Sequence, residues 1–279
     1  MWNKEAITQT ALRVKHAREQ AARESRYRIL LKRLDFPLLS EREVEDLCKA
    51  EIECLGSGQF GTASLVRWNG RLAVLKKALK PTSFYQFIKE FGYLKCLQGA
   101  GGAPKPLGLC LRPLAILISY QGEHTLDDFL QEWRTDEELL DVAVDLCRKV
   151  TEIHGKNIIH NDLKLDNVLV DYQRKVRVID LGNAKFRGTL IFYAKEGKGA
   201  SWMAPEIFSP CAVSPAQDAF SVGYLLRKIA YEMQSPLGLS EIAEGMAERD
   251  QNKRLTVDEA LARLMALRPT CDGGAFFSY

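Results

Sequence analysis

The spacing of apolar residues changes in character near Thr125. Before this point, short apolar runs bounded by Gly, Pro and Asn predict strands at 52–55, 63–68, 72–75, 107–111 and 114–119. Beyond it, apolar residues recur with the helical period, which predicts helices at 125–133, 136–155, 216–233, 239–249 and 256–267. A strand-rich part followed by a helix-rich part predicts an α+β protein with a small β-rich N-lobe and a helical C-lobe. A ligand is expected in the cleft between two such lobes.

Two helices are also predicted within the strand-rich part. Ser40 and Glu43 have the spacing of a capping box, which predicts a helix that runs to about Lys49. Residues 83–98 carry a stripe of large apolar side chains at helical spacing: Phe84, Phe87, Phe91, Leu94 and Leu97. A run of glycines and Pro104 ends this second helix.

Overall composition excludes several classes of protein. Hydrophobic residues make up 46% and charged residues 27% of the 279 residues, which excludes a disordered or collagen-like chain. The net charge of +3 is too small to indicate a dedicated nucleic-acid binder. No apolar run approaches the ~20 residues of a membrane span, and the N-terminus lacks the apolar core of a signal peptide.

The seven cysteines are odd in number, and no two have C-x-x-C spacing. This pattern disfavours both a disulfide framework and a zinc site. We therefore expect reduced thiols in an intracellular, cytoplasmic protein.

Positive charge is concentrated at the N-terminus. Residues 1–34 hold nine Lys or Arg and three Glu, a net charge of +6, so residues 35–279 sum to −3. The segment is rich in helix-forming residues, and residues 1–49 are predicted to form a basic helical extension. Two interpretations stay open: a solvated helix packed on the main domain, or a surface for an acidic partner or anionic lipid.

A glycine run lies between two predicted strands. Gly56, Gly58 and Gly61 have G-x-G-x-x-G spacing, and the Asn69–Gly70 pair that follows suits a tight hairpin turn. Backbone N–H groups of such a loop can lie over phosphates, because no side chain blocks the approach. An ordinary glycine-rich hairpin is the alternative. Lys76 on the next strand could reach the phosphates, and Glu90 on the following helix is its natural partner.

Three further motifs lie in the helix-rich part. Residues 158–170 read Ile-Ile-His-Asn-Asp-Leu-Lys-Leu-Asp-Asn-Val-Leu-Val, residues 178–182 read Val-Ile-Asp-Leu-Gly, and residues 202–206 read Trp-Met-Ala-Pro-Glu. With the glycine loop, their order and spacing resemble the eukaryotic-type protein kinase family over about residues 50–268. The resemblance implies an N-lobe at about 50–119, a C-lobe at about 122–268 and a tail at 269–279.

The resemblance also implies roles for the polar residues. Asp162 corresponds to the catalytic Asp that orients the substrate hydroxyl, and Lys164 would neutralise charge on the transferred phosphoryl group. Lys76, positioned by its partner Glu90, would hold the nucleotide phosphates. The metal ligands would be Asn167 and Asp180, and the implied cofactors are ATP and Mg²⁺, with Mn²⁺ as an alternative.

The implied ATP-binding set combines the glycine loop with the walls of an adenine slot. Ile118 corresponds to the gatekeeper, and the residues after it form the hinge. The set comprises Leu55, Gly56, Ser57, Gly58, Gln59, Phe60, Gly61, Ala63, Val74, Lys76, Ile118, Ser119, Tyr120 and Leu169. The family usually has Val at the position of Ala63 and Ala at the position of Val74. The two sizes are exchanged here, so the total side-chain volume of the slot is roughly conserved.

Three residues have implied structural roles. Glu206 resembles the family's Glu that pairs with an Arg late in the C-lobe, here Arg254, and Asp218 resembles the Asp that holds the catalytic loop from below.

The sequence also departs from the family pattern. Asn161 replaces the Arg that usually precedes the catalytic Asp, and Leu181 replaces a Phe. The Thr expected before Trp202 is replaced by Gly199 or Ala200. Only about five residues separate the helices at 216–233 and 239–249, so the C-lobe is predicted to be shortened.

The predicted function is ATP-dependent transfer of a phosphoryl group to Ser or Thr hydroxyls of protein substrates. Lys164 favours Ser/Thr over Tyr specificity. Two alternatives from other classes remain open: a pseudokinase scaffold that binds partners without catalysis, and a small-molecule phosphotransferase. Because Asn161 is uncharged, we also expect the kinase to be active, or controlled by a partner, without phosphorylation of the segment 183–203.

Overall fold

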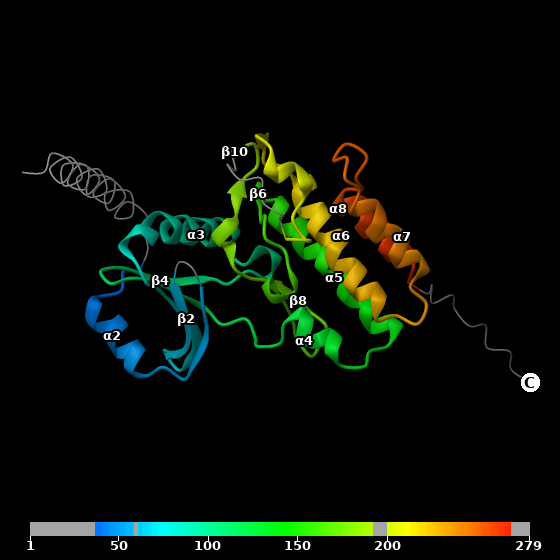
Figure 1. Ribbon diagram of the computed structural model, residues 1–279. Coiled ribbons are helices and arrows are strands. Elements are labelled where there is room, and N and C mark those ends of the chain that lie inside the picture. The colour runs from blue at the N-terminus through cyan, green and yellow to red at the C-terminus, as the bar shows by residue number, and fades with distance from the viewer. Residues whose placement is uncertain (1–36, 59–60, 192–199, 269–279) are drawn as a thin grey trace, which may run out of the picture.

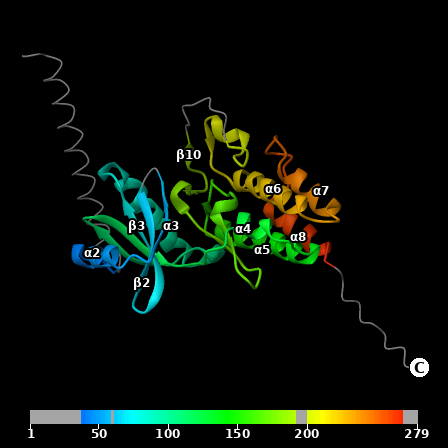
Figure 2. The ribbon, with the colours of Figure 1, turned by 60° about the horizontal axis from the view of Figure 1, so that its bottom comes forward.

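A computed structural model describes residues 37–58, 61–191 and 200–268. The predicted basic segment at 1–34 lies outside these residues, as do Gln59, Phe60 and the tail from residue 269. Figure 1 shows two lobes, with the sheet, α2 (Glu41–Lys49) and α3 (Phe84–Leu97) in one and the remaining helices in the other. The turned view in Figure 2 shows the same division. The predicted two-lobed α+β fold is confirmed.

The N-lobe is built on a five-stranded antiparallel sheet of order β1-β2-β3-β5-β4. Its strands are β1 (Glu53–Ser57), β2 (Gly61–Trp68), β3 (Arg71–Ala78), β4 (Pro106–Leu111) and β5 (Leu114–Ser119). The β2–β3 hairpin turns at Asn69 and Gly70, both with positive φ, as their dipeptide predicts. The strand predicted at 52–55 is shifted by one to two residues, because β1 continues into the glycine loop.

Each face of this sheet is covered by a helix. Leu75 on β3 and Leu117 on β5 pack with Val44 and Leu47 of α2. On the other face, Ile116 of β5 packs with the phenylalanine-rich face of α3, which includes Phe84, Phe87 and Phe91. Since side chains alternate along a strand, this packing determines which residues of β3 face α2 and which face the cleft.

The C-lobe contains five α-helices in the described part of the chain: α4 (Leu126–Gln131), α5 (Asp136–His154), α6 (Pro215–Tyr231), α7 (Leu237–Met246) and α8 (Val257–Ala266). Capping boxes at Thr125, Thr135 and Thr256 begin α4, α5 and α8. Five residues, 232–236, separate α6 from α7, so the short connection is as predicted. None of the described helices is long and apolar enough to cross a membrane.

Short strand pairs surround the loops of the C-lobe. They are β6 (Ile158–Ile159) with β9 (Lys185–Phe186), β7 (Val168–Val170) with β8 (Val176–Val178), and β10 (Leu190–Ile191) with β11 (Cys211–Ala212). Single 3₁₀ turns lie at η1 (Pro81–Ser83), η2 (Ala100–Gly102), η3 (Leu165–Asn167), η4 (Leu181–Asn183) and η5 (Pro205–Phe208). Strands of two or three residues carry no detectable hydrophobic period, so the sequence did not predict them.

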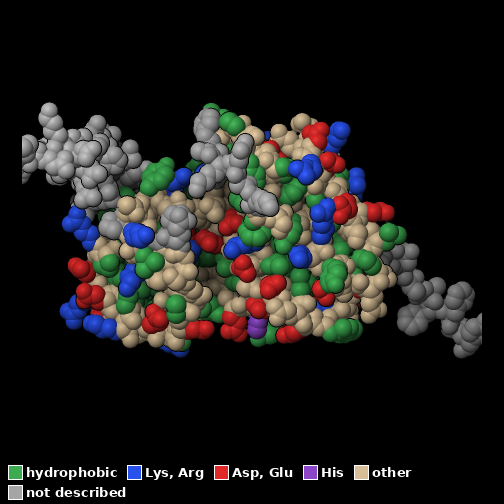
Figure 3. Space-filling view, in the orientation of Figure 1, with side chains coloured by type: hydrophobic (Ala, Val, Ile, Leu, Met, Phe, Trp, Pro, Cys, Tyr) green, Lys and Arg blue, Asp and Glu red, His purple; other side chains and the backbone are tan. Residues whose placement is uncertain are grey.

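Figure 3 shows that the surface is hollowed between the lobes, where acidic and basic side chains meet.

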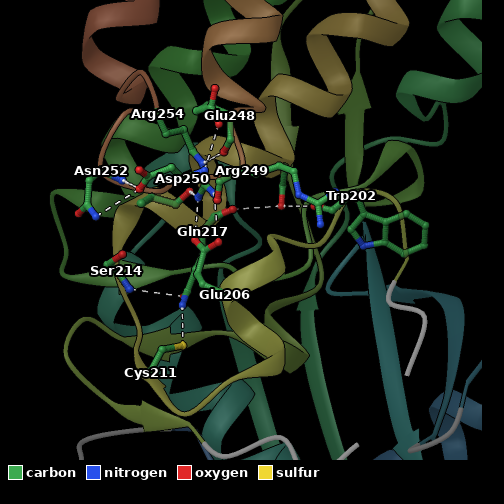
Figure 4. A network of polar contacts seen from close by, with 12 residues as sticks. Trp202, Glu206, Cys211, Ser214, Gln217, Glu248, Arg249, Asp250, Asn252 and Arg254 are labelled. Carbon is green, nitrogen blue, oxygen red and sulfur yellow. Dashed lines mark hydrogen bonds and ion pairs between the residues drawn. The ribbon is translucent and has the colours of Figure 1, made fainter. Parts of the chain in front are cut away.

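A buried ion pair joins two distant segments of the C-lobe. Arg254 donates to both carboxylate oxygens of Glu206, at 2.6 and 3.0 Å, and its side chain is fully buried. It also donates to the carbonyls of Ala216 and Glu248. Figure 4 shows this network at the start of α6 and before α8. The predicted pairing of Glu206 with Arg254 therefore exists, and every contact is charge-assisted.

We predict that α2 is an integral part of the N-lobe. Leu47→Ala should lower the free energy of unfolding by about 2–5 kcal/mol, because it leaves a cavity against the sheet. Glu45→Ala, on the exposed face of the same helix, should change it by less than about 0.5 kcal/mol. Denaturant titration of the full chain measures both, and equal values would mean that α2 does not contribute to the core.

We predict that Arg254→Met lowers the free energy of unfolding by about 3–5 kcal/mol, because Glu206 would lose its buried partner. The neighbouring Lys253 has a side chain that is 76% exposed, and Lys253→Met is the matched control. Chemical denaturation followed by circular dichroism gives both values. A loss for Arg254→Met no larger than that of the control would contradict the structural role of the pair.

Candidate active site

The cleft between the lobes holds two adjoining pockets of about 520 Å³ each. Ala63, Lys76 and Asp180 line both pockets, so the two form one continuous site. The first lies under the glycine loop and reaches Asp162 and Lys164. The second extends to the hinge and includes Tyr120. A concave site of this size, with an apolar end and a charged end, suits a nucleotide.

Three charged side chains from separate elements meet at the centre of the cleft. The ammonium nitrogen of Lys76 on β3 lies 2.6 Å from Oε1 of Glu90 on α3 and 3.3 Å from Oδ1 of Asp180. Burial by itself would lower the pKa of Lys76, but Glu90 and Asp180 together raise it well above its usual value. Lys76 is therefore a fixed cation, with only 19% of its side chain exposed. The predicted Lys76–Glu90 partnership exists in the structure.

The alternation along β3 explains why this lysine points into the cleft. Ala73 and Leu75 are buried beneath α2, so Val74 and Lys76 project to the opposite face. The next lysine, Lys77, contacts the Cys48 thiol of α2 instead. Each of the two adjacent lysines is thus directed to a different side of the sheet.

A second contact joins α3 to the turn that carries Asp180. The side-chain amide of Gln86, one turn before Glu90, donates to the backbone carbonyl of Gly182. Asp180 itself has a left-handed backbone with φ 62°, and its carboxylate accepts the Gly182 amide at 3.2 Å. The turn that carries Asp180 is therefore held by its own hydrogen bond and by the helix above it.

The loop that carries Asp162 is held from below by one buried carboxylate. Asp218 on α6 accepts the backbone amides of His160 and Asn161, each at 2.8 Å, and the ring of His154 at 2.9 Å. Burial would raise the pKa of Asp218, but these hydrogen bonds hold it below its usual value. The predicted location of Asp218 beneath the loop agrees with the structure.

Both oxygens of the Asp162 carboxylate accept hydrogen bonds. The indole nitrogen of Trp202 donates to Oδ1 at 3.0 Å, and Nδ2 of Asn183 donates to Oδ2 at 3.2 Å. Asn167 donates to the Asp162 carbonyl at 2.8 Å. Lys164 forms an ion pair with Asp166 at 3.1 Å. Asp162 is thus oriented by three neighbours while it still lines the cleft.

Asn167 and Asp180 could together hold a divalent cation. Both line the hinge-side pocket, and the Asn167 amide nitrogen is engaged with Asp162, which leaves its carbonyl oxygen as a ligand. The described residues contain no group of three or more His, Cys, Asp or Glu side chains that would bind a metal without help. One carboxylate and one amide fit Mg²⁺, which commonly completes its coordination with substrate phosphates and water.

The residues predicted to form the adenine slot line the hinge-side pocket. Its walls come from both lobes: Leu55, Ala63, Val74, Ile118, Ser119, Tyr120 and Leu169 all line it. Gly56, Gly58 and Gly61 border the pocket under the loop, whereas Ser57 borders neither. Gly61 needs to be glycine because a Cβ there would lie 2.5 Å from the Lys77 carbonyl oxygen. Glu206 and Arg254 lie outside the lining of both pockets, in keeping with their structural role.

Sequence reasoning missed three residues of the site. The sequence analysis did not single out Gln86, which lies in the predicted helix at 83–98, or Asn183, which follows the Val-Ile-Asp-Leu-Gly motif. Trp202 was noted only as part of the Trp-Met-Ala-Pro-Glu motif. Nothing in their local sequence predicts that Asn183 and Trp202 converge on Asp162, because they lie 21 and 40 residues away from it in the chain.

Comparison with known proteins agrees with this geometry. Residues 50–271 match the family described as protein tyrosine and serine/threonine kinase. The serine/threonine-protein kinase CTR1 of Arabidopsis thaliana is 29% identical over 67% of this chain, and a probable serine/threonine-protein kinase of Dictyostelium discoideum is 31% identical over 72%. The serine/threonine-protein kinase STY46 of Arabidopsis thaliana is 27% identical over 58% of this chain.

These alignments cover 24%, 21% and 33% of the respective relatives, so the chain spans a minor part of each. The family match, in contrast, covers most of this chain and includes all the motifs that line the cleft. The chain therefore belongs to the protein tyrosine and serine/threonine kinase family.

Proposed function

We propose that this protein transfers the γ-phosphoryl group of ATP to Ser or Thr hydroxyls of protein substrates. Members of its family use ATP and a divalent metal ion. The observation that carries the proposal is the joining of Lys76, Glu90 and Asp180 in the cleft that also contains Asp162. The names of the three relatives support Ser/Thr rather than Tyr specificity.

Each polar residue has a proposed part in the transfer. Lys76, held by Glu90, would bind and orient the phosphates beneath the glycine loop. Asp162 would orient the substrate hydroxyl and accept its proton, and Lys164 would offset negative charge on the phosphoryl group. Asn167 and Asp180 would hold Mg²⁺ or Mn²⁺, which when bound neutralises charge on the phosphates.

Two other functions are distinguished by the same assay. A pseudokinase would bind nucleotide without transfer, and a small-molecule phosphotransferase would act on a free alcohol instead of a peptide. The chain retains every polar residue that phosphoryl transfer requires, which argues against a pseudokinase. Incubation with labelled ATP, Mg²⁺, a degenerate peptide library and a set of small hydroxylated compounds separates all three.

We predict that Lys76→Met and Asp180→Asn each reduce peptide phosphorylation to background while the fold is retained. The first removes the phosphate-binding cation, and the second weakens the metal site. Lys77→Met is the matched control, because Lys77 lies on the same strand but faces α2. Equal activity of Lys76→Met and Lys77→Met in the labelled-ATP assay would refute the assignment of Lys76.

We predict that Asp162→Asn lowers kcat by roughly two to four orders of magnitude, the usual contribution of a positioned acid–base group. The affinity for ATP should change little, because Asp162 lies beside the phosphate end of the cleft, away from the hinge. Steady-state kinetics with nucleotide titration measures both. Near-normal kcat would show that the catalytic loop is assigned wrongly.

We also propose that activity does not depend on phosphorylation of the segment 183–203. Asn161 stands where many kinases carry an Arg, and it contributes no charge that would require a phosphate. Its amide nitrogen donates to the Ile159 carbonyl, and Lys185 donates to the carbonyls of Asn183 and Ala184. Both side chains thus donate to uncharged backbone carbonyls close to them in the chain, and neither contact requires a phosphate.

Protein made in a host without kinases, and shown by mass spectrometry to be unphosphorylated, should therefore phosphorylate peptides at the normal rate. Thr189→Ala, Tyr193→Phe and Ser201→Ala should each retain that rate. Activity that appears only after one of these hydroxyls gains a phosphate would contradict the proposal.

For the basic segment at residues 1–34, the charge of +6 supports weak, salt-sensitive binding to an acidic partner or anionic lipid. Deletion of residues 1–34 should reduce binding to anionic vesicles to background. Equal binding with and without the segment would exclude the partner-binding interpretation and leave only that of a solvated helix.

The six cysteines in the described part of the chain are free thiols, which supports the proposal of a cytoplasmic location.

A further inference from the structure

Trp202 contacts both of the residues proposed to carry the transfer. Its indole N–H donates to Oδ1 of Asp162 at 3.0 Å, and the ammonium of Lys164 lies 5.8 Å from the centroid of its ring. The indole nitrogen is a donor only, so it can orient a carboxylate but cannot take a proton from a substrate. The ring face attracts a cation within about 6 Å.

The central helix of the C-lobe contacts both the backbone and the ring of Trp202. Ser221 on α6 donates its hydroxyl proton to the Trp202 carbonyl at 2.6 Å, and Tyr224, one turn later, packs its ring at a centroid distance of 6.3 Å. Figure 4 shows the indole turned away from the Arg254–Glu206 ion pair. Because α6 also carries Asp218, one helix supports the loop of Asp162 at two points.

The position where kinases usually carry a Thr that contacts both catalytic residues has no hydroxyl here, since Gly199 and Ala200 stand there. Asp162 nevertheless has a donor on each oxygen, one from Trp202 and one from Asn183. We propose that Trp202 is a positioning residue that replaces this missing hydroxyl and holds Asp162 and Lys164 in the geometry for phosphoryl transfer. The proposal rests on the kinase activity proposed above.

Two contacts of different kinds make this assignment specific. Trp202 donates to Oδ1 of the Asp162 carboxylate and Asn183 donates to Oδ2, so rotation of the carboxylate would weaken both hydrogen bonds. The Trp202 ring attracts the Lys164 ammonium at 5.8 Å, and Asp166 pairs with that ammonium at 3.1 Å. A phenylalanine at 202 would keep the ring but lose the N–H, so the two contacts can be separated.

The first test is steady-state kinetics of Trp202→Phe and Trp202→Leu with a peptide substrate. Trp202→Phe should lower kcat roughly ten- to hundredfold, the scale of a misplaced catalytic group, with the KM for ATP unchanged. Trp202→Leu should lose more, because it also removes the ring from Lys164. Trp133→Phe is the matched control, since Trp133 is 75% exposed and lies outside the lining of the cleft.

An unchanged kcat for Trp202→Phe would overturn the proposal. An increased kcat would also overturn it, because the indole would then obstruct the base. A loss of kcat accompanied by an equal rise in the KM for ATP and a lower melting temperature would indicate a merely structural residue.

The second test detects the contact itself. The chain has four tryptophans, and Trp202→Phe identifies the indole N–H signal of Trp202 in a ¹H–¹⁵N spectrum. Asp162→Ala should shift that signal and leave the signal of Trp133 in place, and an unshifted Trp202 signal would overturn the proposal. Absence of transfer by the unaltered chain would instead overturn the proposed kinase activity, and the spectrum would still report whether the contact exists.

Discussion

The buried carboxylate of Asp218 is the contact on which the rest of the active site depends. It is fully buried on α6 and accepts two successive backbone amides of the catalytic loop together with the ring of His154. A buried charge is stable only when its oxygens are fully hydrogen-bonded, so the carboxylate requires the loop to adopt one conformation. Asn161 accordingly has a left-handed backbone with φ 62°, an uncommon conformation outside glycine. The orientation of Asp162 follows directly from this turn.

The N-lobe is joined through charge to the turn that carries Asp180. Lys76 and Glu90 belong to the sheet and to α3, whereas Asp180 belongs to the C-lobe, and the three side chains meet in the cleft. Burial raises the pKa of Glu90, and the adjacent Lys76 ammonium counteracts that effect. Gln86 adds an uncharged contact between α3 and Gly182. Movement of α3 would therefore disturb both Lys76 and the turn that carries Asp180.

Much of the fold could be predicted because local signals agree with the tertiary packing. The capping box of Ser40 and Glu43 located the start of α2, and the Asn69–Gly70 pair located a hairpin. The order of glycine loop, lysine and glutamate predicted the pairing of Lys76 with Glu90, and the resemblance to the kinase family implied that of Glu206 with Arg254. Both pairs lie within hydrogen-bonding distance. The strand pairs of the C-lobe could not be predicted, since segments such as 158–159 and 211–212 are too short to show a period.

The sequence by itself determined the two lobes, the identity of the polar residues in the cleft and the absence of a charged side chain at position 161. The lobes depend on the spacing of apolar residues within single elements, and the polar residues of the cleft were identified through the resemblance of separate motifs to the kinase family. Only the tertiary structure decided that Trp202 and Asn183 converge on Asp162, that Gln86 contacts Gly182 and that α2 covers the sheet. Each of these contacts joins segments far apart in the chain, and their meeting depends on how α3 and α6 pack against the loops between them. Local sequence preferences do not encode such packing, because it arises from the burial of side chains contributed by the whole domain.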